Sequence, residues 1–295
     1  MIKNYKIFEN AKDRVPIVGL PSGEYLEISF KLFDLLHSSG VLFYNEKYGS
    51  FTFDDKDYDN IIYYMGKHLG VDEKQIIKNF LNNIGVTKYR INSDNTVDSW
   101  DDVIIEGSYY EKLPVAFDCV MGDFKVLSCG LKTLKGCPDV VGGDFICNKN
   151  KLYDLKGGPT EISGDYDVRN NGLYSLEGSP KRIKGDFDCS YNNMPDLNGS
   201  PKIVECSFIS SNGLLVSLKG APEIVKKNFD VSFNLLDTLY GTTTTINGVY
   251  DCSNNDLKTL KDGPKSVGIF KCNGNNKLRN LDGAPVYKKI ISDEL

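Results

Sequence analysis

A segment of 21 residues recurs along most of this chain, with the same residue types at the same positions in each copy. Residues 143–159 read GDFICNKNKLYDLKGGP, residues 164–180 read GDYDVRNNGLYSLEGSP, and residues 185–201 read GDFDCSYNNMPDLNGSP. One such unit cannot bury its own apolar face, whereas stacked units bury it against their neighbours. The repeat therefore predicts a solenoid in which each copy forms one coil.

The apolar positions of the unit form columns along the array. An aromatic residue opens each copy after the first, which opens with Val103; two leucines follow in most copies, and a valine or isoleucine closes them. The aromatic column comprises Phe124, Phe145, Tyr166, Phe187, Phe208, Phe229, Tyr250 and Phe270. With Gly and Pro at fixed offsets, the unit reads F-x-C-x-x-N-x-L-x-x-L-x-G-x-P-x-x-V, and about nine copies lie between residues 103 and 288.

The order of residue types within the unit predicts short strands joined by turns. Alternate residues of a strand face opposite sides, so Phe145 and Cys147 should point inward while Asp144 and Ile146 point outward. Gly and Pro turn the chain where no helical period exists. We expect a β-solenoid over residues 103–288, closed at its start by a capping hairpin over 88–102 and followed by a tail over 289–295.

Residues 1–87 do not repeat, and their pattern predicts a small α+β domain. Helical apolar spacing occurs over 28–39, 54–70 and 72–85, and residues 41–53 have the pattern of a hairpin around Asn45–Ser50. The predicted fold class is therefore α+β, with a small N-terminal domain followed by a β-solenoid of about nine repeats.

The repeat unit resembles the leucine-rich repeat, in particular the short bacterial type with its N-x-L-x-x-L core. The resemblance covers about 185 of the 295 residues and implies a leucine-rich-repeat solenoid. The opening YKIFENAKDR, the run INSDNTVDSWDDVII and the unit GDFDCSYNN are also similar to repeat proteins of large tailed bacteriophages. That similarity implies a phage-encoded protein that acts in a bacterial cytoplasm or is packaged in a virion.

An asparagine recurs after the strand in most copies. We expect this column to point inward, because a side-chain amide can satisfy the backbone groups of a tight bend that a strictly apolar coil would leave unpaired. The predicted structural column comprises Asn150, Asn171, Asn192, Asn234, Asn255 and Asn276.

All eight cysteines lie between residues 103 and 288, and two interpretations compete for them. The F-x-C position carries Val126, Val168 and Val231 in other copies, and Val can replace a small buried hydrophobe but cannot replace a metal ligand. There is no C-x-x-C motif, and the polar N-terminus lacks the apolar stretch of a secretory signal. We therefore expect free, packed thiols and no metal site.

Aspartates flank the aromatic position on the outward face of the predicted strands. Two hypotheses remain open for them: Gly-Asp is a duplicated turn signal whose carboxylate bonds local backbone, or the stacked acid forms a concave groove for a basic protein surface. Calcium binding between stacked carboxylates is a third, although the D-x-D-x-D-G spacing is missing. The candidate binding residues are Asp144, Asp165, Asp167, Asp186, Asp188, Asp230 and Asp251.

Composition and motifs favour a binding protein over an enzyme. The net charge of -5 offers no basic field for nucleic acid or an anionic membrane, and no apolar run reaches the roughly 18 residues of a membrane span. His37 and His68 stand outside any catalytic spacing. We expect a non-catalytic protein-interaction module that uses no cofactor and acts in the cytoplasm or a virion; a structural component of a phage particle and an enzyme with unrecognised chemistry in the N-terminal domain are the alternatives.

Overall fold

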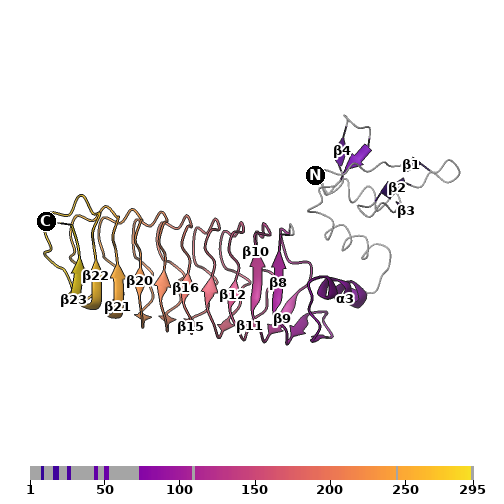
Figure 1. Cartoon of the computed structure of the whole chain (residues 1–295), viewed down its shortest axis with the longest axis horizontal. Coiled ribbons are helices and arrows are strands. Elements are labelled where there is room, and N and C mark those ends of the chain that lie inside the picture. Colours follow the sequence, from indigo (N-terminus) through magenta and orange to yellow (C-terminus); the bar gives the residue numbers. More distant parts are fainter. Residues whose placement is uncertain are drawn as a thin grey trace. The chain divides into compact units, whose positions relative to one another are not determined.

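The computed structural model describes residues 73–107, 110–243 and 245–293, together with the backbone of five short strands between Phe8 and Thr52. The chain divides into two compact units, the larger of which comprises Leu81–Glu106 and Glu111–Leu295. This larger unit is a stack of coils with little helix (Figure 1). The prediction of a β-solenoid with a spacing of about 21 residues is confirmed.

A ten-stranded parallel sheet runs along the stack and contains one strand from each coil. In stacking order its strands are β8 (Val103–Glu106), β10 (Phe124–Leu127), β12 (Phe145–Ile146), β14 (Tyr166–Asp167), β16 (Phe187–Asp188), β18 (Phe208–Ile209), β20 (Phe229–Asp230), β21 (Thr245–Asp251), β22 (Ser266–Lys271) and β23 (Val286–Ile291). Five of these ten strands have only two residues, so each of the five is stable only through its neighbours in the ladder. We call this the long sheet.

A second wall of short strands returns the chain on the other side of the core. Its first part is a five-stranded sheet of β6 (Tyr89–Ile91), β7 (Val97–Ser99), β9 (Phe117–Val120), β11 (Val140–Val141) and β13 (Glu161–Ile162). A separate three-stranded sheet follows, with β15 (Arg182–Ile183), β17 (Ile203–Val204) and β19 (Ile224–Val225). The ladder of the second wall is thus interrupted between β13 and β15.

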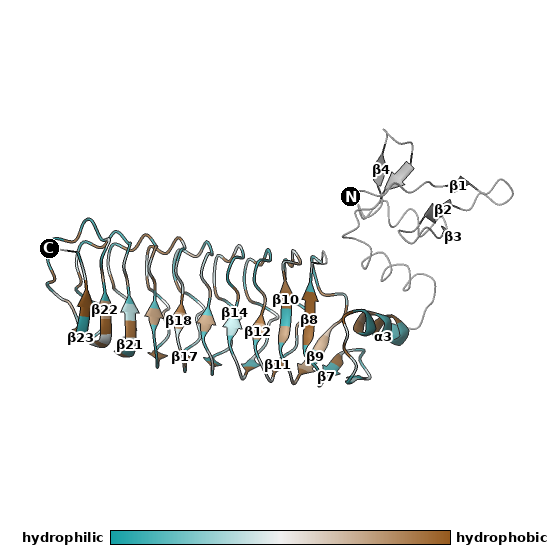
Figure 2. Ribbon diagram, viewed as in Figure 1, coloured by the Kyte–Doolittle hydropathy of each residue, from teal (hydrophilic) through white to brown (hydrophobic). Residues whose placement is uncertain are grey.

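An aromatic ladder fills the interior along the long sheet. Phe124, Phe145, Tyr166, Phe187, Phe208, Phe229, Tyr250 and Phe270 are all completely buried. The ring centroids of successive members lie 5.1 to 5.9 Å apart, within the range at which aromatic pairs attract one another. The leucine and valine columns bury against the other side of the rings, so hydrophobic positions recur in every coil of the stack (Figure 2).

The asparagine column lies inside the stack and satisfies backbone groups of two coils at once. Asn192 Nδ2 donates to the carbonyl oxygens of Val168, Cys189 and Ser190, and its Oδ1 accepts the N–H groups of Asn171 and Leu173. Asn150, Asn171, Asn234 and Asn255 make the same kinds of contact in their coils.

The structure corrects one member of that column. Asn275, not Asn276, accepts the Leu257 N–H and donates to the carbonyls of Cys252 and Cys272, while Asn276 is exposed. This copy has one more residue than the others between its asparagine and the following leucine. The extra residue lies on the exposed turn between Asn275 and Leu278, so the buried asparagine is one position earlier than predicted.

The ends of the array differ in part from the predicted boundaries. The segment 88–102 forms the antiparallel pair β6–β7, and β7 joins β9, so this hairpin provides the last two strands of the five-stranded sheet. At the other end β23 pairs with β22 as far as Ile291, so the sheet continues beyond the predicted limit at 288 into the expected tail.

Outside the solenoid, the described elements agree with two of the local predictions. Helix α3 (Glu73–Asn83) lies within the helix predicted over 72–85, and β4 (Phe43–Asn45) pairs with β5 (Ser50–Thr52) at the predicted hairpin. The strands β1 (Phe8–Glu9), β2 (Pro16–Gly19) and β3 (Tyr25–Glu27) form an antiparallel sheet. The helices predicted over 28–39 and 54–70 lie outside the described residues.

Replacing the buried asparagine should cost far more stability than replacing the cysteine beside it. Asn192→Leu removes two acceptor and three donor contacts from backbone groups without access to water, so we expect a loss of at least about 3 kcal/mol in the free energy of unfolding. Cys189→Val should cost no more than about 1.5 kcal/mol, because Val168 and Val231 already occupy this position. Urea denaturation followed by circular dichroism measures both, and equal midpoints would contradict the role given to Asn192.

The two tyrosines of the aromatic ladder should respond in opposite directions to loss of their hydroxyl. The Tyr250 hydroxyl lies 2.8 Å from Thr242 Oγ1, whereas the Tyr166 hydroxyl is buried without a partner, because Gly158 occupies the position equivalent to Thr242. We expect Tyr250→Phe to lower the free energy of unfolding by about 1 kcal/mol and Tyr166→Phe to leave it unchanged or raise it by about 1 kcal/mol. Thermal unfolding of the two variants tests this, and a matching loss in both would contradict it.

Candidate interaction surface

The aspartates before the aromatic position form a ladder of side-chain to backbone hydrogen bonds. Asp144 Oδ1 accepts the N–H of Asp165 at 2.8 Å, and Asp165 Oδ1 accepts the N–H of Asp186 at 2.7 Å. Asp186 in turn accepts the Ser207 N–H, and Asn228 continues the column by accepting the Val249 N–H. Each of these side chains therefore joins its own coil to the next one.

The glycine before each of these aspartates leaves room for the carboxylate of the preceding coil. A Cβ on Gly164 would lie 2.1 Å from Asp144 Oδ1, and one on Gly185 would lie 2.3 Å from Asp165 Oδ1. Gly248 stands in the same relation to Asn228. The recurring Gly-Asp pair thus has a structural cause. Glycine is not strictly required, because Cys206 occupies the glycine position in the next coil while Asp186 still accepts the Ser207 N–H.

The aspartates after the aromatic position bond the turn that follows them. The Oδ1 atoms of Asp167, Asp188, Asp230 and Asp251 each accept the N–H of the residue two positions further on. Burial raises the pKa of Asp230, which loses water contacts that the charged form needs. These carboxylates are therefore committed to the local backbone, and they are largely buried on the sheet.

Basic side chains neutralise part of the acid on the long sheet. Arg169 forms ion pairs with Asp167 at 3.0 Å and Asp188 at 3.6 Å, and Lys271 pairs with Asp251 at 3.1 Å. The hydrogen bond from Lys125 holds the pKa of Asp123 below its usual value. The structure brings the predicted acidic residues together in columns, and it also gives every one of them a hydrogen-bond donor.

The cysteines of the repeats are packed thiols. All eight are free, and Cys147, Cys189 and Cys252 are completely buried. Burial raises the pKa of Cys252 well above its usual value and that of Cys272 to about 11, so these thiols remain protonated at neutral pH. In the part of the chain that the structure describes, no three His, Cys, Asp or Glu side chains are grouped to hold a metal ion.

The turns on one edge of the stack expose a row of large apolar side chains that the sequence patterns did not single out. We call these residues the apolar strip, and each is between 49% and 62% exposed. Its members are Tyr153, Tyr174, Tyr191, Leu214, Val216, Phe233 and Leu235. Half-exposed side chains of this size contribute on the order of 80–100 Å² each, so the strip approaches the largest patches of ordinary soluble surfaces.

Members of the apolar strip are neighbours because the coils stack in register. The rings of Tyr153 and Tyr174 are parallel within 4°, with centroids 5.7 Å apart. Pro195 and Val216 continue the same column in the next two coils, and the Val216 N–H donates to the Pro195 carbonyl. Leu214 and Leu235 are likewise 21 residues apart. The strip thus contains the stacked pair of Tyr153 and Tyr174, whose column continues to Val216, and the stacked pair of Leu214 and Leu235.

Two members of the strip occupy a backbone conformation that aromatic residues rarely adopt. Tyr191 and Phe233 have φ angles of 56° and 55°, in the left-handed region. The equivalent positions of other coils carry Ser128, Lys149, Asn170, Asn212 and Asn254 at nearly the same φ. Asparagine, present in three of them, is the residue other than glycine that tolerates this conformation best. Both aromatic side chains are about half exposed, so the free energy that they gain from burial offsets little of the conformational cost.

No protein-family model, curated protein or solved structure matches this chain. Within the described residues, no helix is both long enough and apolar enough to cross a lipid bilayer. The two histidines, His37 and His68, lie outside the described residues.

Removing the charge from the aspartates before the aromatic position should be tolerated, whereas removing their hydrogen-bond acceptor oxygen should not. Asp165→Asn keeps an oxygen that can accept the Asp186 N–H, as Asn228 does for Val249, so the free energy of unfolding should change by less than about 0.5 kcal/mol. Asp165→Ala leaves that N–H without its partner and should cost about 1 kcal/mol. Urea midpoints of the two variants give the comparison; a larger loss for the asparagine variant would mean that the charge itself stabilises the stack.

Proposed function

We propose that this chain is a non-catalytic protein-interaction module and that the apolar strip is its principal binding surface. The observation that carries the proposal is the placement of Tyr191 and Phe233: exposed aromatic side chains stand at left-handed positions where three of the other coils use asparagine and none of them uses an apolar residue. A residue that weakens the fold and gains little from burial has its explanation in an interaction outside the chain.

The size and chemistry of the strip suit a protein partner. Its seven side chains sum to roughly 600 Å², close to the roughly 800 Å² that one partner contributes to a standard interface. Aromatic residues are enriched among the side chains that dominate binding energy at such interfaces. The partner should therefore present a complementary apolar surface, bound along the turns of the second to sixth aromatic-led coils.

The acidic long sheet has a secondary place in this proposal. Its carboxylates already accept backbone hydrogen bonds, and Arg169, Lys125 and Lys271 offset part of their charge. The remaining acid would steer a partner with a basic rim toward the strip and increase the association rate at low salt. The resemblances to short leucine-rich repeats and to bacteriophage repeat proteins favour a phage-encoded module whose partner is a protein of the bacterial host.

Replacing the two left-handed aromatics should weaken binding and strengthen the fold at the same time. We expect Tyr191→Asn combined with Phe233→Asn to raise the free energy of unfolding by about 0.5–1 kcal/mol per site, because asparagine relieves the strain at positive φ. The same variant should capture its partner at least tenfold less well, since the strip loses two of its four aromatic side chains.

Paired affinity purification from bacterial lysate, with mass spectrometry, measures the binding half of this prediction. The wild type, the double asparagine variant and a control with Asp165, Asp167, Asp186 and Asp188 all changed to Asn serve as baits. A protein bound by the wild type and the control but lost from the strip variant supports the proposal. A partner kept by the strip variant and lost from the acidic control would move the binding surface to the long sheet.

A further inference from the structure

The interruption of the second wall leaves three main-chain donors without acceptors. In the next coil Lys202 and Ile203 donate their N–H groups to the Lys181 carbonyl, and Glu205 donates to the carbonyl of Ile183. One coil earlier, the equivalent N–H groups make no hydrogen bond; they belong to Lys181, Arg182 and Lys184. The facing carbonyls of Thr160 and Ile162 likewise lack a donor, although every residue of this region is described.

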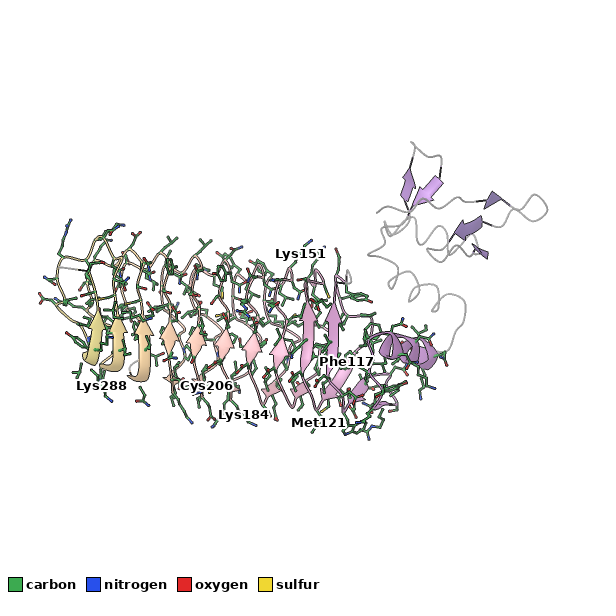
Figure 3. The ribbon with its side chains drawn as sticks, viewed as in Figure 1. Phe117, Met121, Lys151, Lys184, Cys206 and Lys288 are labelled. Carbon is green, nitrogen blue, oxygen red and sulfur yellow. The ribbon has the colours of Figure 1, made fainter. Side chains whose placement is uncertain are left out.

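A groove of about 480 Å³ opens at this interruption. We call it the side groove, and its volume falls in the range of small-molecule sites. Val140, Ile162 and Pro180 give it an apolar lining. Lys184, which borders the groove, lies on the edge of the stack opposite Lys151, whose turn belongs to the edge that carries the apolar strip (Figure 3). The side groove is therefore separate from the surface proposed for protein binding.

The two sides of the groove have opposite polarity. One side presents Lys181, Arg182 and Lys184, together with their unpaired N–H groups. Arg182 is paired with Glu205, but Lys181 has no ion pair, and Lys184 makes only a 3.3 Å hydrogen bond to Ser163 Oγ. The other side presents Glu161, which has no ion pair, and the free carbonyls. A ligand that pairs with the charged side chains of both sides, Lys181 and Glu161, would carry an anionic acceptor and a cationic donor.

A buried hydroxyl in the lining also lacks a partner. Ser179 Oγ is shielded from solvent and makes no hydrogen bond. Ser200 occupies the equivalent position one coil further on, where its hydroxyl donates to the Leu197 carbonyl at 2.8 Å. Unsatisfied buried polar atoms are rare in folded proteins, and this one belongs to the groove in which three N–H groups are also unpaired.

From these contacts we infer that the side groove binds a small zwitterion of the α-amino acid class. Its carboxylate would accept hydrogen bonds from the N–H groups of Lys181 and Arg182, whose equivalents in the next coil converge on a single acceptor, and pair with the Lys181 ammonium group. Its ammonium group would donate to the carbonyl of Ile162 and pair with Glu161. An aliphatic side chain would contact Val140, Ile162 and Pro180.

Titration of the ¹⁵N-labelled full chain with each of the common α-amino acids tests the inference. We expect saturable shifts of the Lys181 and Arg182 amide signals with at least one aliphatic member, and a dissociation constant of about 1 mM or lower. For that amino acid, the N-acetyl derivative lacks the ammonium group and the carboxamide lacks the carboxylate. Each derivative should bind at least about tenfold more weakly, because a charge-assisted contact is lost.

Variants on the groove should reproduce those losses while a matched position does not. Lys181→Gln and Glu161→Gln should each weaken binding about tenfold, and Lys202→Gln, at the position of Lys181 one coil further on, should leave it unchanged. No saturable shift with any amino acid overturns the inference. Equal binding of the free amino acid and its N-acetyl derivative also overturns it, because the site would then be one for anions alone.

Discussion

Hydrogen bonds between positions 21 residues apart are the interaction on which the rest of this structure depends. A strand of two residues such as β14 has no stability of its own, and it persists because its main chain bonds to the coils on both sides. The aromatic ladder needs the same register, since Phe145, Tyr166 and Phe187 touch only when their strands are aligned. Asn192 then joins the backbone of two coils through a single side chain.

Sequence periodicity predicted this register well because every buried position of the unit repeats. The aromatic, leucine and asparagine columns could be assigned from spacing alone, and the assignment fails only at Asn276, where one extra residue shifts the phase. Spacing does not reveal on which side of Asn275 that residue is accommodated, because both choices restore the phase at Leu278. Packing explains the observed position of the extra residue, because an exposed turn accepts an insertion more easily than a buried bend.

The apolar strip and the side groove could not be predicted in the same way. Exposed positions carry no periodic constraint, so Leu214 or Val216 looks like any other variable residue in the alignment of copies. One signal was nevertheless present, since Tyr191 and Phe233 alternate with Asn170, Asn212 and Asn254 at a single position of the unit. The interruption between β13 and β15 has no such signal, because Glu161 and Arg182 fit the pattern of their neighbours.

The left-handed position after each strand has a consequence for how such a protein can change over time. Its backbone is fixed by bonds to the next coil, as in the Asn170 N–H donating to Ser190 and the Asn212 N–H donating to Ser232, while its side chain points away from the core. Residues at this position can be exchanged one codon at a time without disturbing the interior. Duplication of one whole unit would lengthen the row of exposed residues by a single strand spacing of about 4.8 Å. Recognition in this architecture is thus separable from folding, and a new surface can be assembled coil by coil on an unchanged frame.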